Sequence, residues 1–217
     1  MIVARLIALG IGYVCGLFQT GYIYGRSKGI DIRTEGSGNA GTTNSLRVLG
    51  WKAGLITFLG DLLKAILSVV IVYLLFKGSY PEQVRVLELY AGFGTVLGHN
   101  FPCYLKFKGG KGIACTAGLT FALFPGAVPV CLTVFVLCIA LSKYVSLGSI
   151  MMSILLVIQI FVFNFYGILG VPETSVVEFD ILVLVLGVLA IFQHRENIVR
   201  LFKGTENKLG QKAEIKK

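Results

Sequence analysis

The residues best suited to chemistry lie in segment 98–112, which reads Gly-His-Asn-Phe-Pro-Cys-Tyr-Leu-Lys-Phe-Lys-Gly-Gly-Lys-Gly between two long apolar runs. Glycine lets backbone N–H groups approach a ligand closely, and lysine favours anionic oxygens, so the composition predicts a phosphate site. The segment is not a Walker P-loop, because no Ser or Thr follows Lys111 and the long spacer from a first glycine is missing. A phosphate site here therefore needs partners from elsewhere in the chain.

Two other polar segments offer such partners. Segment 36–47 reads Gly-Ser-Gly-Asn-Ala-Gly-Thr-Thr-Asn-Ser-Leu-Arg, and segment 194–210 begins His-Arg-Glu-Asn-Ile-Val-Arg. The small, hydroxyl and amide side chains of the first suit an oxygen-rich anionic ligand. A solvated linker is the alternative, but this segment has the signature of a helix that begins at Thr42 or Thr43, which a linker does not need.

We expect the three segments to meet in one donor-rich, cation-rich site with few carboxylates, which suits phosphate groups. The candidate residues are Ser37, Asn39, Thr43, Asn44 and Arg47; then His99, Lys108, Gly109, Gly110 and Lys111; then His194, Arg195, Asn197, Arg200 and Glu206. The sequence contains no Ser-His-Asp order or paired catalytic carboxylates, and two histidines do not supply a zinc site without further ligands, so no metal is predicted. Positioning and charge stabilisation would carry the catalysis. A bound phosphate oxygen or a histidine would accept the proton.

Two polar features lie inside the apolar runs. Asp61 and Lys64 are spaced i, i+3 on one helix face, and each charge costs ~2.5–3.5 kcal/mol on membrane-insertion scales, so a mutual ion pair is expected. A role beneath the ligand site is the alternative. The cysteines at 15, 103, 115, 131 and 138 have no Cys-x-x-Cys pairing, and all but Cys103 are interpreted as small membrane-buried hydrophobic residues. Cys103 has no dedicated base that would make it a nucleophile.

The elements that must position these residues are membrane helices. The 217-residue chain is 55% hydrophobic and 14% charged, with a mean hydropathy of +0.81, so we expect one all-α integral membrane domain over residues 1–217. At ~20 residues per span, the apolar runs supply six or seven helices. The expected helices cover 2–24, 53–76, 84–97, 113–124, 127–141, 147–168 and 179–192. The first run lacks a cleavage site and is interpreted as a retained helix.

The distribution of charge favours seven transmembrane helices, with the N-terminus outside and the C-terminus in the cytoplasm. This count follows from a chain break at Pro125-Gly126, and six helices would place the basic tail outside. The expected cytoplasmic cations are Arg26, Lys28, Arg33, Arg47, Lys52, Lys106, Lys108, Lys111, Lys143, Arg195, Arg200, Lys203, Lys208, Lys212, Lys216 and Lys217. The opposite side holds only Arg5, Lys77 and Arg85, as the positive-inside rule predicts. Orientation and anionic headgroups thus explain the net charge of +9, and no nucleic-acid partner is predicted.

These segments resemble the three cytoplasmic motifs of the bacterial acyl-phosphate:glycerol-3-phosphate acyltransferases. The likeness rests on segments 36–47, 98–112 and 194–206. Asp61-Leu62-Leu63-Lys64 also resembles the Asp-x-x-Lys of that family, and Ser146-Leu147-Gly148-Ser149 its serine-bearing start of helix six. The likeness covers the whole chain in order, and Thr42, where alanine is common in the family, is a mild departure.

The resemblance implies a seven-helix enzyme of the bacterial inner (plasma) membrane whose active site faces the cytoplasm. It would transfer an acyl group from acyl phosphate to the 1-hydroxyl of sn-glycerol 3-phosphate, giving lysophosphatidic acid and inorganic phosphate, the first committed step of phospholipid synthesis. It implies no cofactor. It also implies functional coupling to the enzyme that supplies acyl phosphate.

The resemblance further assigns residues to the two substrates. The residues that would hold acyl phosphate are Ser37, Asn39, Thr43, Asn44, Arg47 and Lys111, and those that would orient glycerol 3-phosphate are Lys108, Ser149, His194 and Asn197. His99, Gly109, Gly110, Arg200 and Glu206 complete the expected site, in which Ser37, Arg47, Lys111, His194 and Asn197 carry the catalytic roles. The family lacks the His-x4-Asp dyad of thioester-using acyltransferases, and Tyr104 and Val199 stand where its Asp would follow the two histidines. The phosphate of the substrate would then take the proton.

Two other classes of protein stay as alternatives. A transporter of phosphorylated metabolites is suggested by Asp61, Lys64 and the broken run at Pro125, but the two halves of the chain lack the paired repeats that transporters often have. A non-catalytic membrane anchor would have no need of the three polar segments.

Overall fold

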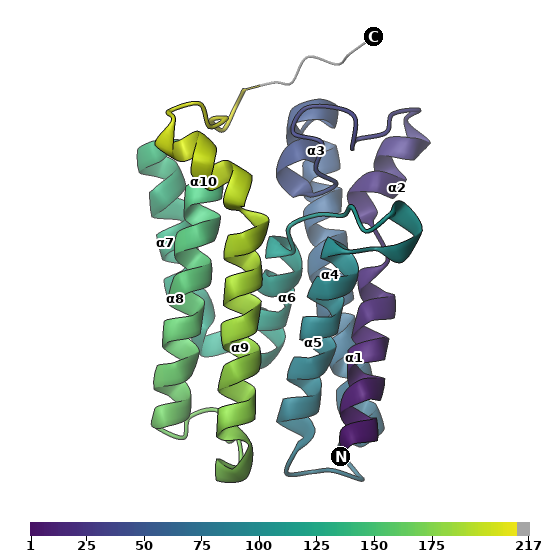
Figure 1. The fold of residues 1–217 in the computed structure, drawn as a ribbon, viewed down its shortest axis with the longest axis vertical. Helices are drawn as coiled ribbons and strands as arrows, with labels where there is room; N and C mark the ends of the chain where they lie inside the picture. Colours follow the sequence, from purple (N-terminus) through teal and green to yellow (C-terminus); the bar gives the residue numbers. More distant parts are fainter. Residues whose placement is uncertain (212–217) are drawn as a thin grey trace.

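The apolar runs form α-helices that stand side by side in one bundle, as the computed structural model shows for residues 1–211 (Figure 1). The helices are α1 (Ile2–Gly16), α2 (Thr20–Ser27), α3 (Thr42–Leu49), α4 (Trp51–Phe76), α5 (Val84–Asn100), α6 (Ile113–Leu123), α7 (Val128–Ser142), α8 (Val145–Phe165), α9 (Glu173–Gln193) and α10 (Arg195–Phe202). Two 3-10 turns, Cys103–Leu105 and Pro125–Ala127, join α5 to α6 and α6 to α7. The predicted all-α class is confirmed. Lys212, Lys216 and Lys217 of the charge argument lie outside the described residues.

Five segments within residues 1–211 are long and apolar enough to cross a membrane. They are Ile2–Ser27, Trp51–Phe76, Pro125–Ser142, Val145–Phe165 and Glu173–Gln193. The prediction of a multi-pass membrane protein is therefore confirmed. The helices α5 and α6 have 17 and 11 residues. Because an 11-residue helix is only ~16 Å long, α6 reaches about half of a ~30 Å hydrocarbon layer. The count of seven spans and the orientation of the termini stay predictions.

The first predicted helix is wrong in one respect, because it is interrupted. Helix α1 ends at Gly16 and α2 begins at Thr20. The Gln19 side chain fills the break and donates to the carbonyl oxygens of Gly16, Gly98 and His99 at 3.1, 3.3 and 3.0 Å. The polar pair Gln19-Thr20 marks the break in the sequence, but the apolar residues on both sides led to the prediction of one helix. Lys64 of α4 also donates to the freed carbonyl oxygens of Gly16 and Phe18, so the backbone at the break is satisfied, as a break inside a membrane requires.

Two other predicted boundaries can be compared with the structure. The break at Pro125-Gly126 is confirmed, since α6 ends at Leu123 and α7 begins at Val128. The start predicted for the last membrane helix, residue 179, is wrong, because α9 already begins at Glu173, directly after Pro172. The early turns of α9 are held by Glu178, which accepts from Arg5 of α1 at 2.5 Å and from Tyr90 of α5 at 2.8 Å. Glu173 and Glu178 thus lie within the helix and not before it.

The three polar segments lie at one end of the bundle. In Figure 1, α2, α3, α10 and the chain between α5 and α6 all gather at the upper end, and the N-terminus lies at the lower end. Helix α3 begins at Thr42, as predicted. The convergence expected from the charge pattern is therefore present in the fold.

Candidate active site

A cavity of about 400 Å³ opens among the three polar segments and continues between α6, α7 and α8. Most of the residues predicted for the site line it: Ser37, Asn39, Thr43, Asn44, Arg47, His99, Lys111, Ser149, His194, Asn197, Arg200 and Glu206. Lys108, Gly109 and Gly110 are not among its lining residues. The polar side chains surround one end of the cavity, and the side chains of α6, α7 and α8 give the rest an apolar wall.

Each polar segment is tied to the other two by hydrogen bonds. Asn39 Nδ2 of the first segment donates to the Gly109 carbonyl oxygen of the second at 3.4 Å. Arg47 of the first donates to the Asn207 carbonyl oxygen of the third, also at 3.4 Å. Lys111 Nζ of the second donates to Asn197 Oδ1 of the third. Three segments far apart in sequence therefore form one site.

The first segment supplies an arginine with unused hydrogen-bonding capacity. Among the described residues, the buried Nε of Arg47 and the buried Oγ1 of Thr42 have no hydrogen-bond partner. Burial, only partly offset by the carboxylate of Glu206, lowers the pKa of the Arg47 guanidinium, which nevertheless stays charged at neutral pH. A buried, charged donor that faces a cavity is a site for an anion.

Asn44, in contrast, serves the loop that carries it. Its Oδ1 accepts from the Ser37 backbone N–H at 2.9 Å, and its Nδ2 donates to the carbonyl oxygens of Ile32 and Glu35 at 3.0 Å each. Both amide protons are therefore used within the loop. The sequence predicted a substrate contact here, whereas this geometry makes Asn44 the support of Ser37.

The two glycines of the second segment approach the end of α5. A Cβ added to Gly109 would lie 1.9 Å from the His99 carbonyl oxygen, and one added to Gly110 would lie 2.0 Å from His99 Nε2. Their amides also donate to α5, at 3.1 Å to the carbonyl oxygens of Asn100 and His99. The glycines thus make room for α5, and the neighbouring Lys108 is exposed. Of this segment, His99, Lys111 and Gly112 line the cavity.

The third segment is organised around the buried carboxylate of Glu206. Its Oε1 accepts from Ser146 at 3.0 Å and from Asn197 at 2.7 Å, and its Oε2 accepts from Arg200 Nε at 2.7 Å. Burial raises the pKa of Glu206, but the hydrogen bonds from Asn197, Arg200 and Ser146 outweigh burial and lower it. We call Arg47, Lys111, Asn197, Arg200 and Glu206 the mouth network. The sequence did not predict that Ser146, on α8, would join this carboxylate.

The mouth network contains more positive than negative charge. Arg47, Lys111 and Arg200 stand beside the buried carboxylate of Glu206, and the only other carboxylate that pairs with them in residues 1–211 is that of the exposed Glu196, 3.9 Å from Arg200. Burial, reinforced by the charge of Arg200, lowers the pKa of Lys111 to about 8. An anion that entered the cavity would relieve this mutual repulsion, so the network is suited to bind phosphate.

His194 is held in a defined state beside this network. It is 4% exposed, and its Nδ1 lies 2.8 Å from the Ala190 carbonyl oxygen. Because a carbonyl only accepts, we assign the ring proton to Nδ1, which leaves Nε2 as the acceptor of the neutral ring. Burial, together with the charge of Lys111, lowers the pKa of His194 to about 4. The ring is therefore neutral at pH 7 and can accept a hydrogen bond from a hydroxyl group.

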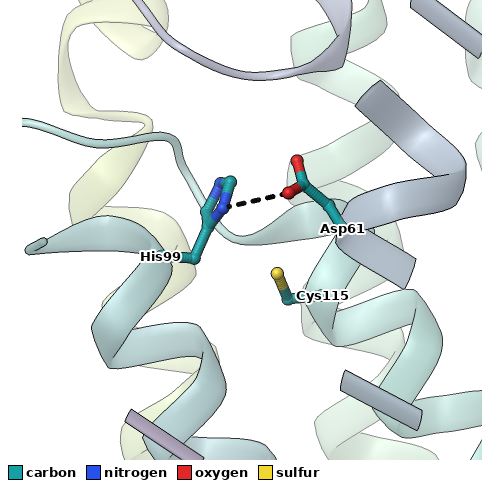
Figure 2. A group of neighbouring side chains, drawn as sticks. All are labelled: Asp61, His99 and Cys115. Atoms are coloured by element: carbon teal, nitrogen blue, oxygen red, sulfur yellow. Dashed lines mark ion pairs between the residues drawn. The ribbon is translucent and has the colours of Figure 1, made fainter. Parts of the chain in front are cut away.

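A second polar cluster lies deeper and involves His99. The ion pair predicted between Asp61 and Lys64 is confirmed, with Nζ and Oδ1 2.8 Å apart. His99 joins them, since its Nδ1 lies 2.9 Å from Lys64 Nζ. The same nitrogen lies 3.5 Å from Asp61 Oδ1 (Figure 2). We call Asp61, Lys64 and His99 the buried network. The local spacing predicted the ion pair, but only the packing of α4 against α5 brings in the histidine.

The apolar part of the cavity has the dimensions of a hydrocarbon chain. Along α8 its lining residues run from Ser146 to Leu156. This distance is ~15 Å, or half of a ~30 Å hydrocarbon layer. Phe121 of α6 and Leu132 of α7 both line the cavity and are about half exposed, so the trough is open on the side that lipid would cover. A polar mouth above an apolar trough suits an amphiphile with an anionic head.

Comparisons with known proteins agree with this geometry. The profile of the family described as glycerol-3-phosphate acyltransferase matches residues 6–204. The glycerol-3-phosphate acyltransferase of Thermoanaerobacter sp. is 44% identical over 207 residues, which cover 95% of this chain and 96% of that protein. The protein of the same name from Clostridioides difficile is 41% identical over 219 residues, which cover 98% and 99%.

Two crystal structures are also similar to the structure of this chain. The structure of PlsY (YgiH), an integral membrane glycerol 3-phosphate acyltransferase, in its glycerol 3-phosphate form has a TM-score of 0.79 and 35% sequence identity, covering 95% of this chain and 96% of that chain. The lysophosphatidic acid form of PlsY has a TM-score of 0.77 with the same identity and coverage.

Proposed function

Because this chain belongs to the glycerol-3-phosphate acyltransferase family, we propose that it is an acyltransferase that uses acyl phosphate as its donor. The acceptor is the 1-hydroxyl of sn-glycerol 3-phosphate, and the products are lysophosphatidic acid and inorganic phosphate. The enzyme acts in phospholipid synthesis at the bacterial inner (plasma) membrane, with its polar mouth towards the cytoplasm. It is functionally coupled to the enzyme that supplies acyl phosphate.

One observation carries this proposal: a cation-rich mouth stands directly above an apolar trough. Arg47 and Lys111 face the space where the two parts meet. Acyl phosphate has a phosphate head joined to a hydrocarbon tail, so it matches both parts at once, and its reacting carbonyl carbon would lie at their junction. A thioester donor would bring no phosphate directly to that junction. This match supports acyl phosphate as the donor.

In the proposed reaction, the oxygen of the glycerol 3-phosphate hydroxyl attacks the carbonyl carbon of acyl phosphate. A new ester bond forms, and the bond between that carbon and the phosphate oxygen breaks. The phosphate leaves with the electron pair and takes the hydroxyl proton. Arg47, Lys111 and the Ser37 hydroxyl stabilise the departing phosphate, because they place positive charge and donors where negative charge develops.

The acceptor substrate is oriented from the other side of the mouth. The unprotonated Nε2 of His194 accepts a hydrogen bond from the 2-hydroxyl of glycerol 3-phosphate, so the proton of the attacking 1-hydroxyl stays free for the phosphate. Asn197 and Ser149 hold the rest of glycerol 3-phosphate. Glu206 acts through its partners, since it fixes Asn197 and Arg200. Holding the two substrates in reactive geometry supplies most of the rate enhancement.

The test uses the purified protein in detergent or lipid with palmitoyl phosphate and glycerol 3-phosphate. We expect phosphate release that depends on both substrates, and an acyl thioester donor should give background product. Arg47→Ala and Lys111→Ala should each abolish most of the release. Release at background, or release indifferent to both substitutions, would contradict the proposal. Uptake of glycerol 3-phosphate into proteoliposomes without a donor would favour a transporter instead.

A further inference from the structure

The Lys64 ammonium is enclosed by acceptors from three parts of the chain. Its Nζ lies 2.8 Å from Asp61 Oδ1 and 2.9 Å from His99 Nδ1. It also donates to the carbonyl oxygens of Phe18 at 2.6 Å and Gly16 at 3.3 Å, both freed by the break between α1 and α2. Lys64, Asp61 and His99 are 6%, 1% and 3% exposed. The charge is thus buried, balanced and satisfied.

These surroundings have the chemistry of a metal site. A carboxylate oxygen of Asp61, a ring nitrogen of His99 and Sγ of Cys115 lie within 4.8 Å of one another. Figure 2 shows the Cys115 thiol pointing from α6 towards the space between the other two side chains. Carboxylate, imidazole and thiolate are ligands of divalent transition metals, and carbonyls of unwound helices coordinate cations within membranes. A metal ion here would compete with the lysine, which already binds Asp61 and His99.

The ammonium also connects the two parts of the chain that carry the phosphate-binding cations. Helix α2, which follows the break, packs closely on the first polar segment, since a Cβ added to Gly21 would lie 2.2 Å from the Ala40 carbonyl oxygen. That segment ends with Arg47. His99 stands near the end of α5, which leads into the segment of Lys111. The buried Lys64 ammonium therefore bonds to the chain on which both walls of the mouth rest. One wall is the segment that carries Arg47, and the other is the segment that carries Lys111.

We propose that Lys64 is a tethered cation that occupies a latent metal site made by Asp61, His99 and Cys115, and that it positions the two walls of the mouth for acyl transfer. Lys64 touches neither substrate, so it is a positioning residue. Its effect on acyl transfer rests on the proposed function. Its occupation of a cation site does not.

The first test asks whether removal of the lysine uncovers the metal site. The purified full-length Lys64→Ala protein is titrated with Co²⁺ and followed by visible and near-ultraviolet absorption. We expect a thiolate-to-cobalt charge-transfer band that wild-type protein lacks. The double variant Lys64→Ala with Cys115→Ser is the matched control and should lose that band. A band of equal strength in wild type, or none in folded Lys64→Ala protein, would overturn the latent site.

The second test asks whether the charge itself positions the mouth. Lys64→Met keeps the aliphatic stem but removes the ammonium, and we expect kcat/KM to fall about 10²-fold, as small misplacements of reacting groups do. Lys64→Ala should also be slow, but ethylammonium ions that enter from the cavity should restore part of its rate. The same ions should leave Lys64→Met unchanged, because its stem fills the space. A structural contact alone would not produce this difference between the two variants.

The outcomes separate this inference from the proposed function. Wild-type rates in Lys64→Met, or no amine rescue of folded Lys64→Ala, would overturn the positioning role while the activity of the wild-type protein stood. If wild type itself transferred no acyl group, the proposed function would fail. The cobalt titration would still decide the latent site.

Discussion

The mouth network and the buried network both combine basic and acidic side chains, but they differ in how far their charges and hydrogen bonds are satisfied. In the mouth network, the three cations Arg47, Lys111 and Arg200 share one buried carboxylate, with only the exposed Glu196 as a further pair of Arg200 in the described chain, and Arg47 Nε has no partner among the described residues. In the buried network, Asp61 balances Lys64, and the ammonium has four acceptors within 3.3 Å. The first network has capacity left for an anion, whereas the second has none. An unbalanced cluster is suited to binding, and a balanced one to holding helices in register.

The largest effect on activity is expected when the mouth network loses the guanidinium of Arg47. Arg47→Ala should lower kcat/KM for acyl phosphate about 10²–10³-fold, the usual cost of removing one donor that stabilises a developing charge. Arg47→Lys is the matched control and should recover only part of the loss, because an ammonium does not reproduce the planar fork. Phosphate-release kinetics measure both. Equal rates in Arg47→Ala and wild type would show that the unused donor does not face the substrate.

The next effect concerns the carboxylate that organises the mouth. Glu206→Ala should cost about 2–3 kcal/mol of stability, because buried donors of Asn197 and Ser146 would lose their partner. Thermal unfolding in detergent measures this cost. Glu206→Gln keeps an acceptor oxygen and should lose less. If both variants unfolded at the wild-type temperature, the carboxylate would not be the centre of the third segment.

His194 tests whether the mouth also orients the acceptor substrate. His194→Ala should raise KM for glycerol 3-phosphate about tenfold, the equivalent of one hydrogen bond, and leave KM for acyl phosphate nearly unchanged. Because the pKa of His194 is about 4, its ring stays neutral from pH 5 to 8 and should cause no change in rate there. Steady-state kinetics with each substrate varied measure the split. An equal rise in both KM values would contradict the assignment.

The pH dependence of phosphate binding tests the contribution of Lys111 to the mouth network. With a pKa of about 8, its amine is charged below that pH and neutral above it. Phosphate binding should therefore weaken as the pH rises from 8 towards 9.5. In Lys111→Arg the guanidinium stays charged over this range, so this alkaline decline should disappear even if the variant is slower. An unchanged decline in Lys111→Arg would assign it to another group.

The smallest effect is expected from a lysine that belongs to neither network. Lys108 is exposed and does not line the cavity. Lys108→Ala should change KM for glycerol 3-phosphate by less than about twofold, as substitutions at exposed positions usually do. A rise of tenfold or more would favour the role that the family resemblance assigned and would mean that the lysine folds onto the substrate.

The sequence by itself determined the class of protein and much of the site. Composition and run lengths were sufficient for an all-helical membrane protein, because each apolar run must satisfy its backbone as a helix. Most of the residues predicted from the three polar segments line the cavity, since their donors and cations have no reason to interrupt apolar runs otherwise. The Asp61 and Lys64 pair and the break at Pro125 were also predictable, because both depend on residues that are close together in the sequence.

Only the tertiary structure decided which groups are free to bind and which are already used. The helix break at 17–19, the place of His99 beside Lys64, and the partners of Gly109 and Gly110 all depend on how α1, α4 and α5 pack. Asn44 and Arg47 come from one polar segment, yet one is satisfied by its own loop and the other retains an unused donor. Hydrogen-bond satisfaction is a property of the register between helices, and no single stretch of sequence contains that register.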